Sequence, residues 1–514
     1  MTEISENNKR ITRNTILLYI RMFISMAITL YTSRVVINVL GVEDYGIYGV
    51  VGGVVAIFNF LTVSMATATS RFLTYELGTG DKKKLADTFV TSFWEHGLIA
   101  LIVVVLVESI GVWFLNNKMD IPIERLTAAN VVLQMAVLSM VASVMKVPFS
   151  ASVISHEQMN VYAYIELIDV GLRLGVVFIL MFGNFDKLIL YSILTFSVIL
   201  LMVLVYGVYC RRNYEECRIR FELHPQIFKT MMKFSGWDLY GNMSVAMRTQ
   251  GVNILLNLFF GPVVNAAAGI ATQVQGAVMA FGSSVTTAVK PQIIKYYAQR
   301  EFDQMASLIR NALKLNYIIL LLPTVPLAAE LNFVLYKWLG IVPDWTVSFC
   351  VFTLLFNILT SFAGILVSGI HATGKNVLPN VINGTLYLLV IPFSYFAYKN
   401  GAAPWMSFAF NVGAVAMGMT SNAIVLHNYI HSFCLRTFFV KDMPNFFMVL
   451  LLSYMSCFFC KQILTEGWIR LFVSIFVSSV VIVLYSYHFI IPKTVCKQFF
   501  YSLKRKFKAK PFNE

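Results

Sequence analysis

The sequence predicts an all-α integral membrane protein with about 14 transmembrane helices. Hydrophobic residues make up 58% of its 514 positions. They gather into stretches of about 20 residues, the length that an α-helix needs to cross a bilayer. Most of the Lys and Arg residues lie in alternate connections between these stretches. The expected spans, with edges good to a few residues, are 15–40, 45–68, 90–115, 127–152, 161–183, 188–210, 235–260, 264–289, 315–338, 345–370, 378–398, 402–427, 443–460 and 467–491.

The basic residues predict the orientation of the chain in the membrane. With a cytosolic N terminus, 28 of the 40 Lys and Arg residues fall in cytosolic segments, 7 in outer connections and 5 inside spans. Because cytosolic loops are enriched in Lys and Arg, both termini are expected in the cytosol. The net charge of +14 then reflects loops that meet anionic lipid headgroups, and no nucleic-acid partner is expected.

The first span is expected to be retained in the mature protein. Lys9, Arg10 and Arg13 precede an apolar run, as they would in a signal peptide. That run is longer than a signal peptide needs, and Arg21 and Arg34 interrupt it, so a retained helix fits better.

The chain contains an internal repeat. When the sequence is shifted against itself so that Gly41 falls on Gly261, Gly49 falls on Gly269 without a gap. Identities between apolar segments prove little by themselves, but each copy also has a short outer turn, a Gly/Ala-rich helix and a basic cytosolic stretch. Six spans separate the copies, so the two have the same orientation. Parallel repeats of this kind predict two six-helix lobes, related by an axis along the membrane normal, with a cavity between them.

Five segments are expected along the chain. They are an N-terminal six-helix lobe (1–210), a cytosolic linker (211–233), a C-terminal six-helix lobe (234–430), two additional transmembrane helices (431–492) and a basic cytosolic tail (493–514). The tail alternates Phe and Leu with Lys and Arg. An amphipathic helix on the inner leaflet and a disordered basic tail both fit that pattern.

Five cations lie within the expected spans: Arg21, Arg34, Lys146, Arg173 and Arg248. Each costs roughly 2.5 to 3.5 kcal/mol on insertion scales unless it faces protein or water. Arg173 and Arg248 sit near the midplane, whereas the other three are close enough to a membrane face to extend their charged ends toward water. We therefore expect a cationic cavity that binds substrate through Arg34, Arg248, Arg173 and Arg21.

Six carboxylates share the membrane: Glu95, Glu108, Glu166, Asp169, Asp238 and Glu330. Glu166, Asp169 and Arg173 follow a helical i, i+3, i+7 spacing, so Asp169 and Arg173 form an i, i+4 pair. That pair is either a structural ion pair or a gate sensitive to protons or cations. The candidates for gating or ion coupling are Asp169, Glu166, Asp238 and Glu330.

Polar and aromatic residues in the spans would suit a sugar. Desolvated cations bind phosphate or carboxylate strongly, so an excess of positive charge in a cavity selects an anionic solute. Any single residue of the polar set is more often a helix-packing residue than a ligand contact. The set is Trp237, Tyr240, Asn242, Asn357, Asn380, Asn383, Tyr387 and Asn411.

Enzyme signatures are absent from the sequence. There is no G-x-x-x-x-G-K-[ST] loop for nucleotide hydrolysis, and neither H-E-x-x-H nor G-x-S-x-G occurs. The outer connections are too short for a catalytic domain. Cys457 and Cys460 lie within an apolar span and lack a second ligand pair. We expect no enzymatic activity, no catalytic residue, no metal and no cofactor.

The segment from Tyr31 to Tyr48, YTSRVVINVLGVEDYGIY, resembles the polysaccharide flippases of the Wzx type. These belong to the multidrug/oligosaccharidyl-lipid/polysaccharide exporter (MOP) superfamily. The turn after the first span, from Leu40 to Gly46, is its most specific part. Fourteen spans in two lobes extend the likeness to the whole chain and imply a fold like that of the MATE multidrug exporters.

This resemblance implies a carrier for surface polysaccharide biosynthesis in a bacterial inner membrane. It would move an undecaprenyl-diphosphate-linked oligosaccharide, such as an O-antigen unit, from the inner to the outer leaflet by alternating access. Its partners would be the lipid-linked glycan, membrane lipids, a polysaccharide polymerase and chain-length proteins. Three alternatives remain open: a proton- or sodium-coupled drug antiporter, a peptidoglycan-precursor flippase, and a membrane glycan polymerase.

Overall fold

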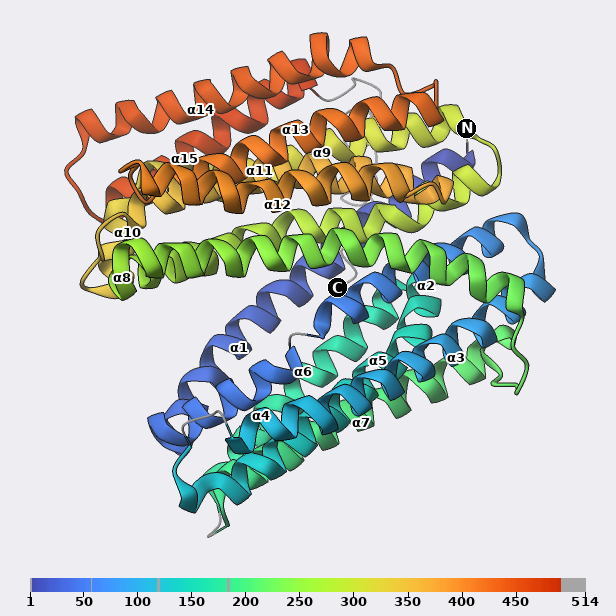
Figure 1. Ribbon diagram of the computed structural model, residues 1–514. Coiled ribbons are helices and arrows are strands. Elements are labelled where there is room, and N and C mark those ends of the chain that lie inside the picture. The colour runs from blue at the N-terminus through green and yellow to red at the C-terminus, as the bar shows by residue number, and fades with distance from the viewer. Residues whose placement is uncertain (1, 57, 118–120, 183–184, 491–514) are drawn as a thin grey trace, which may run out of the picture. The chain divides into compact units, whose positions relative to one another are not determined.

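The structure is a computed structural model that describes residues 2–56, 58–117, 121–182 and 185–490. The side chains of residues 2–16 and of Arg34 lie outside this description, as does the tail 493–514. The described residues are helical and contain no strand, which confirms the predicted all-α class (Figure 1). The helices are α1 (Thr2–Ala56), α2 (Asn59–Thr79), α3 (Lys82–Leu106), α4 (Val112–Asn117), α5 (Leu126–Ser155), α6 (Met159–Met181), α7 (Lys187–Asn213), α8 (Pro225–Ala298), α9 (Phe302–Ala329), α10 (Leu331–Leu339), α11 (Thr346–Thr373), α12 (Val377–Lys399), α13 (Met406–Tyr429), α14 (Met443–Ile463) and α15 (Trp468–Tyr485). Short 3₁₀ turns (Ile123–Arg125, Glu215–Cys217) and π-helical segments (Val107–Gly111, Thr437–Asp442, Ser486–Ile490) complete them.

Ten helices of the described residues are long and apolar enough to cross a membrane. Four of the 14 expected spans fall outside that set: 15–40, 45–68, 161–183 and 235–260. Span 161–183 carries Glu166, Asp169 and Arg173 within about two helical turns, and span 235–260 contains Asp238 and Arg248 among many polar residues. The candidate charges of span 161–183, rather than a low hydropathy, therefore keep it out of the set.

The repeat predicted from the sequence is visible in the backbone. Gly41 and Gly261, which the repeat places on each other, interrupt α1 and α8 with φ angles of 80° and 82°. With ψ at 166° and −177°, both lie in a region of backbone space that is essentially restricted to glycine. Each kink therefore separates two successive membrane helices that run on without a loop.

The shift that places Gly41 on Gly261 also relates the first residues of several helices in the two repeats. It carries Lys82, the first residue of α3, onto Phe302, the first residue of α9, and it carries the start of α5 onto the start of α11. The residues before α3 and α9 also correspond: Gly80 and Arg300 both have positive φ, 78° and 62°. The second repeat thus reproduces the helix starts of the first.

The contacts divide the chain into two compact units. The first comprises the described residues up to Met243, with Ile294–Arg300 and His371–Asn380. The second comprises Ser244–Ile293, Glu301–Ile370 and the described residues from Val381 on. Three short segments of the second repeat, 234–243, 294–300 and 371–380, therefore belong to the unit that contains the first repeat.

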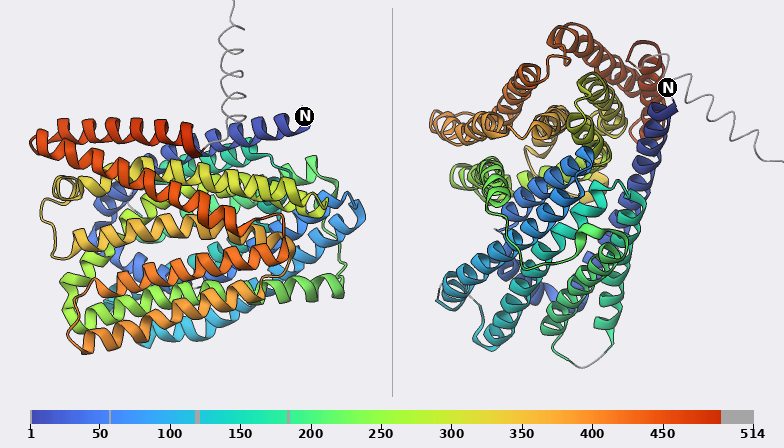
Figure 2. Two further views of the ribbon diagram at one scale, coloured as in Figure 1. Left: turned by 90° about the horizontal axis from the view of Figure 1, so that it is seen from above. Right: turned by 90° about the vertical axis from the view of Figure 1, so that its right-hand side faces the viewer.

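The core of the first unit is apolar. Its buried side chains come from α2, α3, α5 and α7 around Leu133 and Val103, and from α3, α5, α6 and α7 around Phe89 and Tyr206. In the second unit, α14 and α15 pack on each other and on α9 (Figure 2). Tyr317 of α9 donates a hydrogen bond to the backbone oxygen of Phe446 in α14 and so fixes this packing.

Candidate functional site

Arg248 is a buried cation in contact with two aromatic rings. It lies on α8 in the second unit and is 7% exposed. Its guanidinium carbon stands 4.9 Å from the ring centre of Phe356 on α11 and 4.7 Å from that of Tyr387 on α12. These cation–π contacts stabilise the charge. Within the described residues no carboxylate pairs with Arg248, and its buried Nη1 has no hydrogen-bond partner. The group can therefore donate hydrogen bonds to a ligand.

A small, mostly apolar cavity shares Tyr387 with Arg248. Its volume is about 180 Å³, and no carboxylate lines it. Its lining residues are Thr360, Ala363, Gly364, Val367, Asn383, Tyr387, Val415, Gly418, Met419 and Asn422.

Two lining atoms have hydrogen-bonding capacity left over. Thr360 Oγ1 and Asn383 Oδ1 are buried without a partner, whereas Asn383 Nδ2 donates to Asn422 Oδ1 at 3.1 Å. A Cβ atom on Gly418 would stand 2.7 Å from Asn383 Oδ1, so glycine leaves room for that amide. An aromatic ring beside unpaired hydroxyl and amide oxygens suits a neutral polyol such as a sugar.

Asp169 and Arg173 form the expected ion pair. Arg173 Nε donates to Asp169 Oδ2 at 2.8 Å, between residues one turn apart on α6. The Arg173 side chain is 45% exposed within the chain. Because its charge is already matched, Arg173 is less available to an anion than Arg248 is.

Glu166 lies between two cations. Its carboxylate is 3.9 Å from Arg21 Nη1 and 3.7 Å from Lys146 Nζ. Tyr206 on α7 donates a hydrogen bond to it at 3.1 Å. The structure thus brings Arg21 into one cluster with Glu166, while Arg34 lies outside the described side chains.

Glu330 holds two helices together. It lies between α9 and α10, is 2% exposed, and accepts hydrogen bonds from Arg470 of α15 at 2.7 and 3.1 Å and from Ser474 at 3.3 Å. These contacts occupy both carboxylate oxygens. The geometry therefore indicates a structural tie for Glu330, where the sequence suggested a gating or ion-coupling group.

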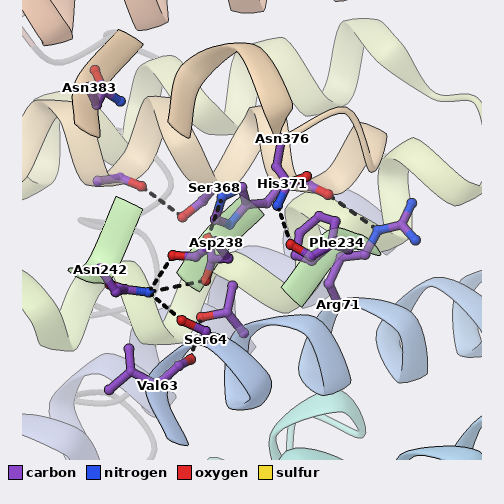
Figure 3. A network of polar contacts seen from close by, with 12 residues as sticks. Val63, Ser64, Arg71, Phe234, Asp238, Asn242, Ser368, His371, Asn376 and Asn383 are labelled. Carbon is purple, nitrogen blue, oxygen red and sulfur yellow. Dashed lines mark hydrogen bonds and ion pairs between the residues drawn. The ribbon is translucent and has the colours of Figure 1, made fainter. Parts of the chain in front are cut away.

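Asp238 belongs to a polar network in the first unit (Figure 3). Its carboxylate lies 3.4 Å from His371 Nε2, and both side chains are buried. Asn242 Nδ2 donates to Ser64 Oγ at 2.9 Å and approaches Asp238 Oδ2 at 3.4 Å. The sequence pointed to Asp238 and Asn242 but not to His371, because nothing in the pattern relates positions so far apart along the chain.

The acidic turn after the first span has a structural role. Arg125 donates to both carboxylate oxygens of Asp44 and, at 2.6 Å, to Asp186, which caps the start of α7. Burial, the largest single influence, would raise the pKa of Asp186. The hydrogen bond and charge of Arg125, together with the backbone N–H groups of Leu188 and Ile189, outweigh it and lower that pKa. This tie joins three helices of the first unit and is not repeated in the second, where Val264 takes the place of Asp44 in the repeat.

Several contacts at the Arg248 site were not predictable from sequence. Asn383 and Tyr387 belonged to the expected polar set, whereas Phe356, Thr360 and Asn422 did not. Their residue types are common in membrane helices and give no signal by themselves. Among the described residues, no group of three or more His, Cys, Asp or Glu side chains is arranged to hold a metal ion.

Comparison with solved structures shows what the arrangement resembles. A family model described as MatE matches residues 18–179. A crystal structure of a MATE mutant superposes with a TM-score of 0.72 at 14% identity, covering 82% of this chain and 96% of that chain. The chain has the MATE fold.

Other structures with the MATE fold extend the likeness. An outward-facing multidrug resistance MATE family transporter of the MOP superfamily has a TM-score of 0.71 at 15% identity, covering 82% of this chain and 96% of its own. A MOP superfamily transporter from Pyrococcus furiosus, described as having a binding pocket of reverse polarity, has a TM-score of 0.68 at 15% identity and the same two coverages. These likenesses establish the fold.

A sequence relative is also found among curated proteins. The uncharacterized membrane protein EpsK of Bacillus subtilis (strain 168) is 19% identical over 319 residues, which is 62% of this chain. The match spans 63% of the length of EpsK. Together with the ten apolar helices, the MATE fold makes this chain a multi-pass integral membrane protein.

Proposed function

We propose that this protein is a flippase that carries an undecaprenyl-diphosphate-linked oligosaccharide from the inner to the outer leaflet of a bacterial inner membrane. The single observation that carries the proposal is Arg248, a buried cation without a carboxylate partner among the described residues. A buried charge of this kind is costly unless its site receives an anion. The adjacent cavity, which has Thr360, Asn383 and Tyr387 in its lining and no carboxylate, supports a glycan as the rest of the cargo.

The mechanism assigns separate parts of the cargo to separate groups. Arg248 holds the diphosphate through charge-assisted hydrogen bonds, which are the strong ones for guanidinium and phosphate. A sugar of the glycan enters the cavity beside Tyr387 and binds Thr360 and Asn383, while the polyprenyl tail stays in the bilayer. Arg34 and Arg173 are proposed to hold the diphosphate together with Arg248, and Arg21 remains a predicted substrate-binding residue of the cavity. Alternating access then delivers the head group to the outer leaflet.

A drug antiporter is the strongest alternative, because one solved structure with the same fold is a multidrug resistance transporter. Such a protein would expel cations and would need available carboxylates. Here Asp169, Glu166 and Glu330 each lie beside a cation. The Arg248 site has the opposite charge from the one that a cationic drug requires, so the flippase is favoured.

A peptidoglycan-precursor flippase and a membrane glycan polymerase differ from the proposal in cargo or in chemistry. The first would use the same diphosphate contacts, and it differs in being required for growth. The second would need catalytic groups, and the short outer connections disfavour it. Supplying an exogenous flippase separates carrier from polymerase, because it restores polymer only where the missing step is translocation.

Deletion of the gene in its native host tests the proposal. The lipid-linked oligosaccharide is followed by leaflet-specific labelling, with complementation by wild type, Arg248→Ala, Arg248→Lys and the control Arg436→Ala. Arg436 is an exposed residue of the second unit. We expect cytosolic accumulation of the lipid-linked unit, rescue by wild type and Arg436→Ala, partial rescue by Arg248→Lys and none by Arg248→Ala.

A different outcome would refute the flippase proposal. An unchanged glycan profile, with greater sensitivity to cationic drugs, would refute the flippase and support the antiporter. Protein amounts in the membrane are measured for each variant, so that loss of expression is not read as loss of transport.

A further inference from the structure

The turn between α11 and α12 is held against α2 and α8 of the first unit by three sets of contacts. Arg71 of α2, which is 7% exposed, donates to the backbone oxygens of His371 and Ala372, each at 3.2 Å. These are among the last carbonyls of α11, which lack partners within the helix. Gly374 has a φ of 76°, and a Cβ atom there would stand 2.8 Å from Arg71 Nη2. The turn is therefore shaped to receive this guanidinium.

A second contact fixes the other end of the turn. Asn376, which is 1% exposed, donates from Nδ2 to the backbone oxygen of Phe234 on α8 at 2.9 Å. The ring of Phe234 meets the ring of His371 edge-on at 5.4 Å and that of Phe72 at 5.8 Å. Figure 3 shows Arg71, Phe234, His371 and Asn376 gathered around the turn.

The third contact is the only one of the three that exchanges a proton. His371 and Asp238 have buried side chains, 8% and 7% exposed, with Nε2 and Oδ1 3.4 Å apart. Asn242 supports the carboxylate from the other side. Protonated His371 neutralises Asp238, whereas neutral His371 withdraws that compensating charge from a buried carboxylate, which is costly.

We propose that Asp238 and His371 form a proton-binding site that controls how firmly the α11–α12 turn is clasped to α2 and to the N-terminal part of α8. The clasped turn binds a proton more tightly than the released turn, so it is favoured at low pH. Its stability falls as the pH rises and the bound proton is lost. The clasp also joins the two repeats, because Arg71 belongs to the first repeat whereas Asp238 and His371 belong to the second.

Other charged groups near the pair make contacts of their own. Arg71 uses its donors on backbone carbonyls and stacks on the rings of Phe72 and Tyr75. On α3, Glu95 accepts a hydrogen bond at 3.5 Å from Ser235, which lies one turn before Asp238. Lys375 in the turn is exposed. The proton-dependent part of the clasp is thus assigned to Asp238 and His371, whatever the cargo of the protein.

Hydrogen–deuterium exchange of the purified full-length protein tests this site without any transport assay. Protection of the segment 371–380 is measured at pH 6 and pH 8 and corrected for intrinsic exchange rates. In wild type we expect protection to fall by up to about tenfold per pH unit, the limit for one linked proton. His371→Gln and Asp238→Asn should remove the pH dependence.

Two further variants complete the experiment. Arg71→Lys should lower protection at both pH values but keep the pH dependence, because lysine cannot reproduce the forked contact with two carbonyls. His427→Gln, at a histidine bonded to the Phe433 oxygen in the second unit, should behave as wild type. Equal protection of wild type at both pH values, or a pH dependence that persists in His371→Gln, would overturn the proposal. The experiment measures only local protection from exchange. A result that overturns the proton-binding site would therefore not bear on the proposed flippase function.

Discussion

At the residue scale, Arg248 stands out because a charged side chain is costly to insert into a membrane. The structure shows which side chains surround it. The cost argument needs only the sequence, because a midplane arginine must face something polar or a π-system. It cannot name Phe356 and Tyr387, which reach Arg248 from helices much later in the chain. His371 escapes the same argument, since a histidine near a helix end is unremarkable in sequence.

Gly418 allows the cavity to be tested separately from stability. In Gly418→Ala the new Cβ would stand 2.7 Å from Asn383 Oδ1, and that amide would shift away from Asn422 and into the cavity. Because a flexible side chain moves rather than the backbone, we expect little change in melting temperature but a clear loss of glycan translocation. Gly413→Ala, on the same helix with nothing within 4 Å of the added methyl group, is the control and should translocate normally.

At the element scale, the repeat is where sequence reasoning reaches furthest. The glycine at the helix junction recurs because both copies need a backbone conformation that other residues avoid. The pairing of α9 and α10 with α15 through Glu330 was not foreseen, since Arg470 looked like an outer-loop residue that only sets topology. A sequence gives the depth of such a residue approximately but not the direction in which it points.

Gly261→Ala tests the junction. The φ of 82° and ψ of −177° would be imposed on a residue with a Cβ, at a cost of about 1 to 3 kcal/mol. We expect a lower melting temperature for the purified protein. Gly269→Ala, one of the matched helical positions with open space around it, should melt as wild type does. Equal melting of both variants would show that the kink is not required.

The Glu330 tie is tested by a double-mutant cycle. Glu330→Gln leaves the cation of Arg470, 12% exposed, without its buried partner, and should destabilise the protein by about 3 to 5 kcal/mol. Adding Arg470→Gln should recover part of that loss, because the charge left behind is then removed. Thermal unfolding in detergent measures both effects, and strictly additive losses would mean that the pair does not interact.

At the scale of the whole molecule, hydropathy and charge suffice for the class, and the MATE fold agrees with it. The orientation remains a prediction that rests on the asymmetry of 28 basic residues against 7. Reporter fusions test it: a fluorescent protein that folds only in the cytosol should be bright when fused at either terminus. An alkaline phosphatase fusion should be active after Lys399, in an expected outer connection, and inactive after Lys375. The reverse pattern would invert the topology.

The most direct test of the central claim is binding to the purified protein in lipid nanodiscs. Undecaprenyl diphosphate carrying one sugar is titrated against wild type and Arg248→Gln, in parallel with a cationic dye. Loss of a charge-assisted contact worth about 1.5 to 3 kcal/mol should weaken lipid binding at least about tenfold in Arg248→Gln, with little dye binding to either protein. Tight dye binding, together with lipid binding that is the same in both proteins, would contradict the account.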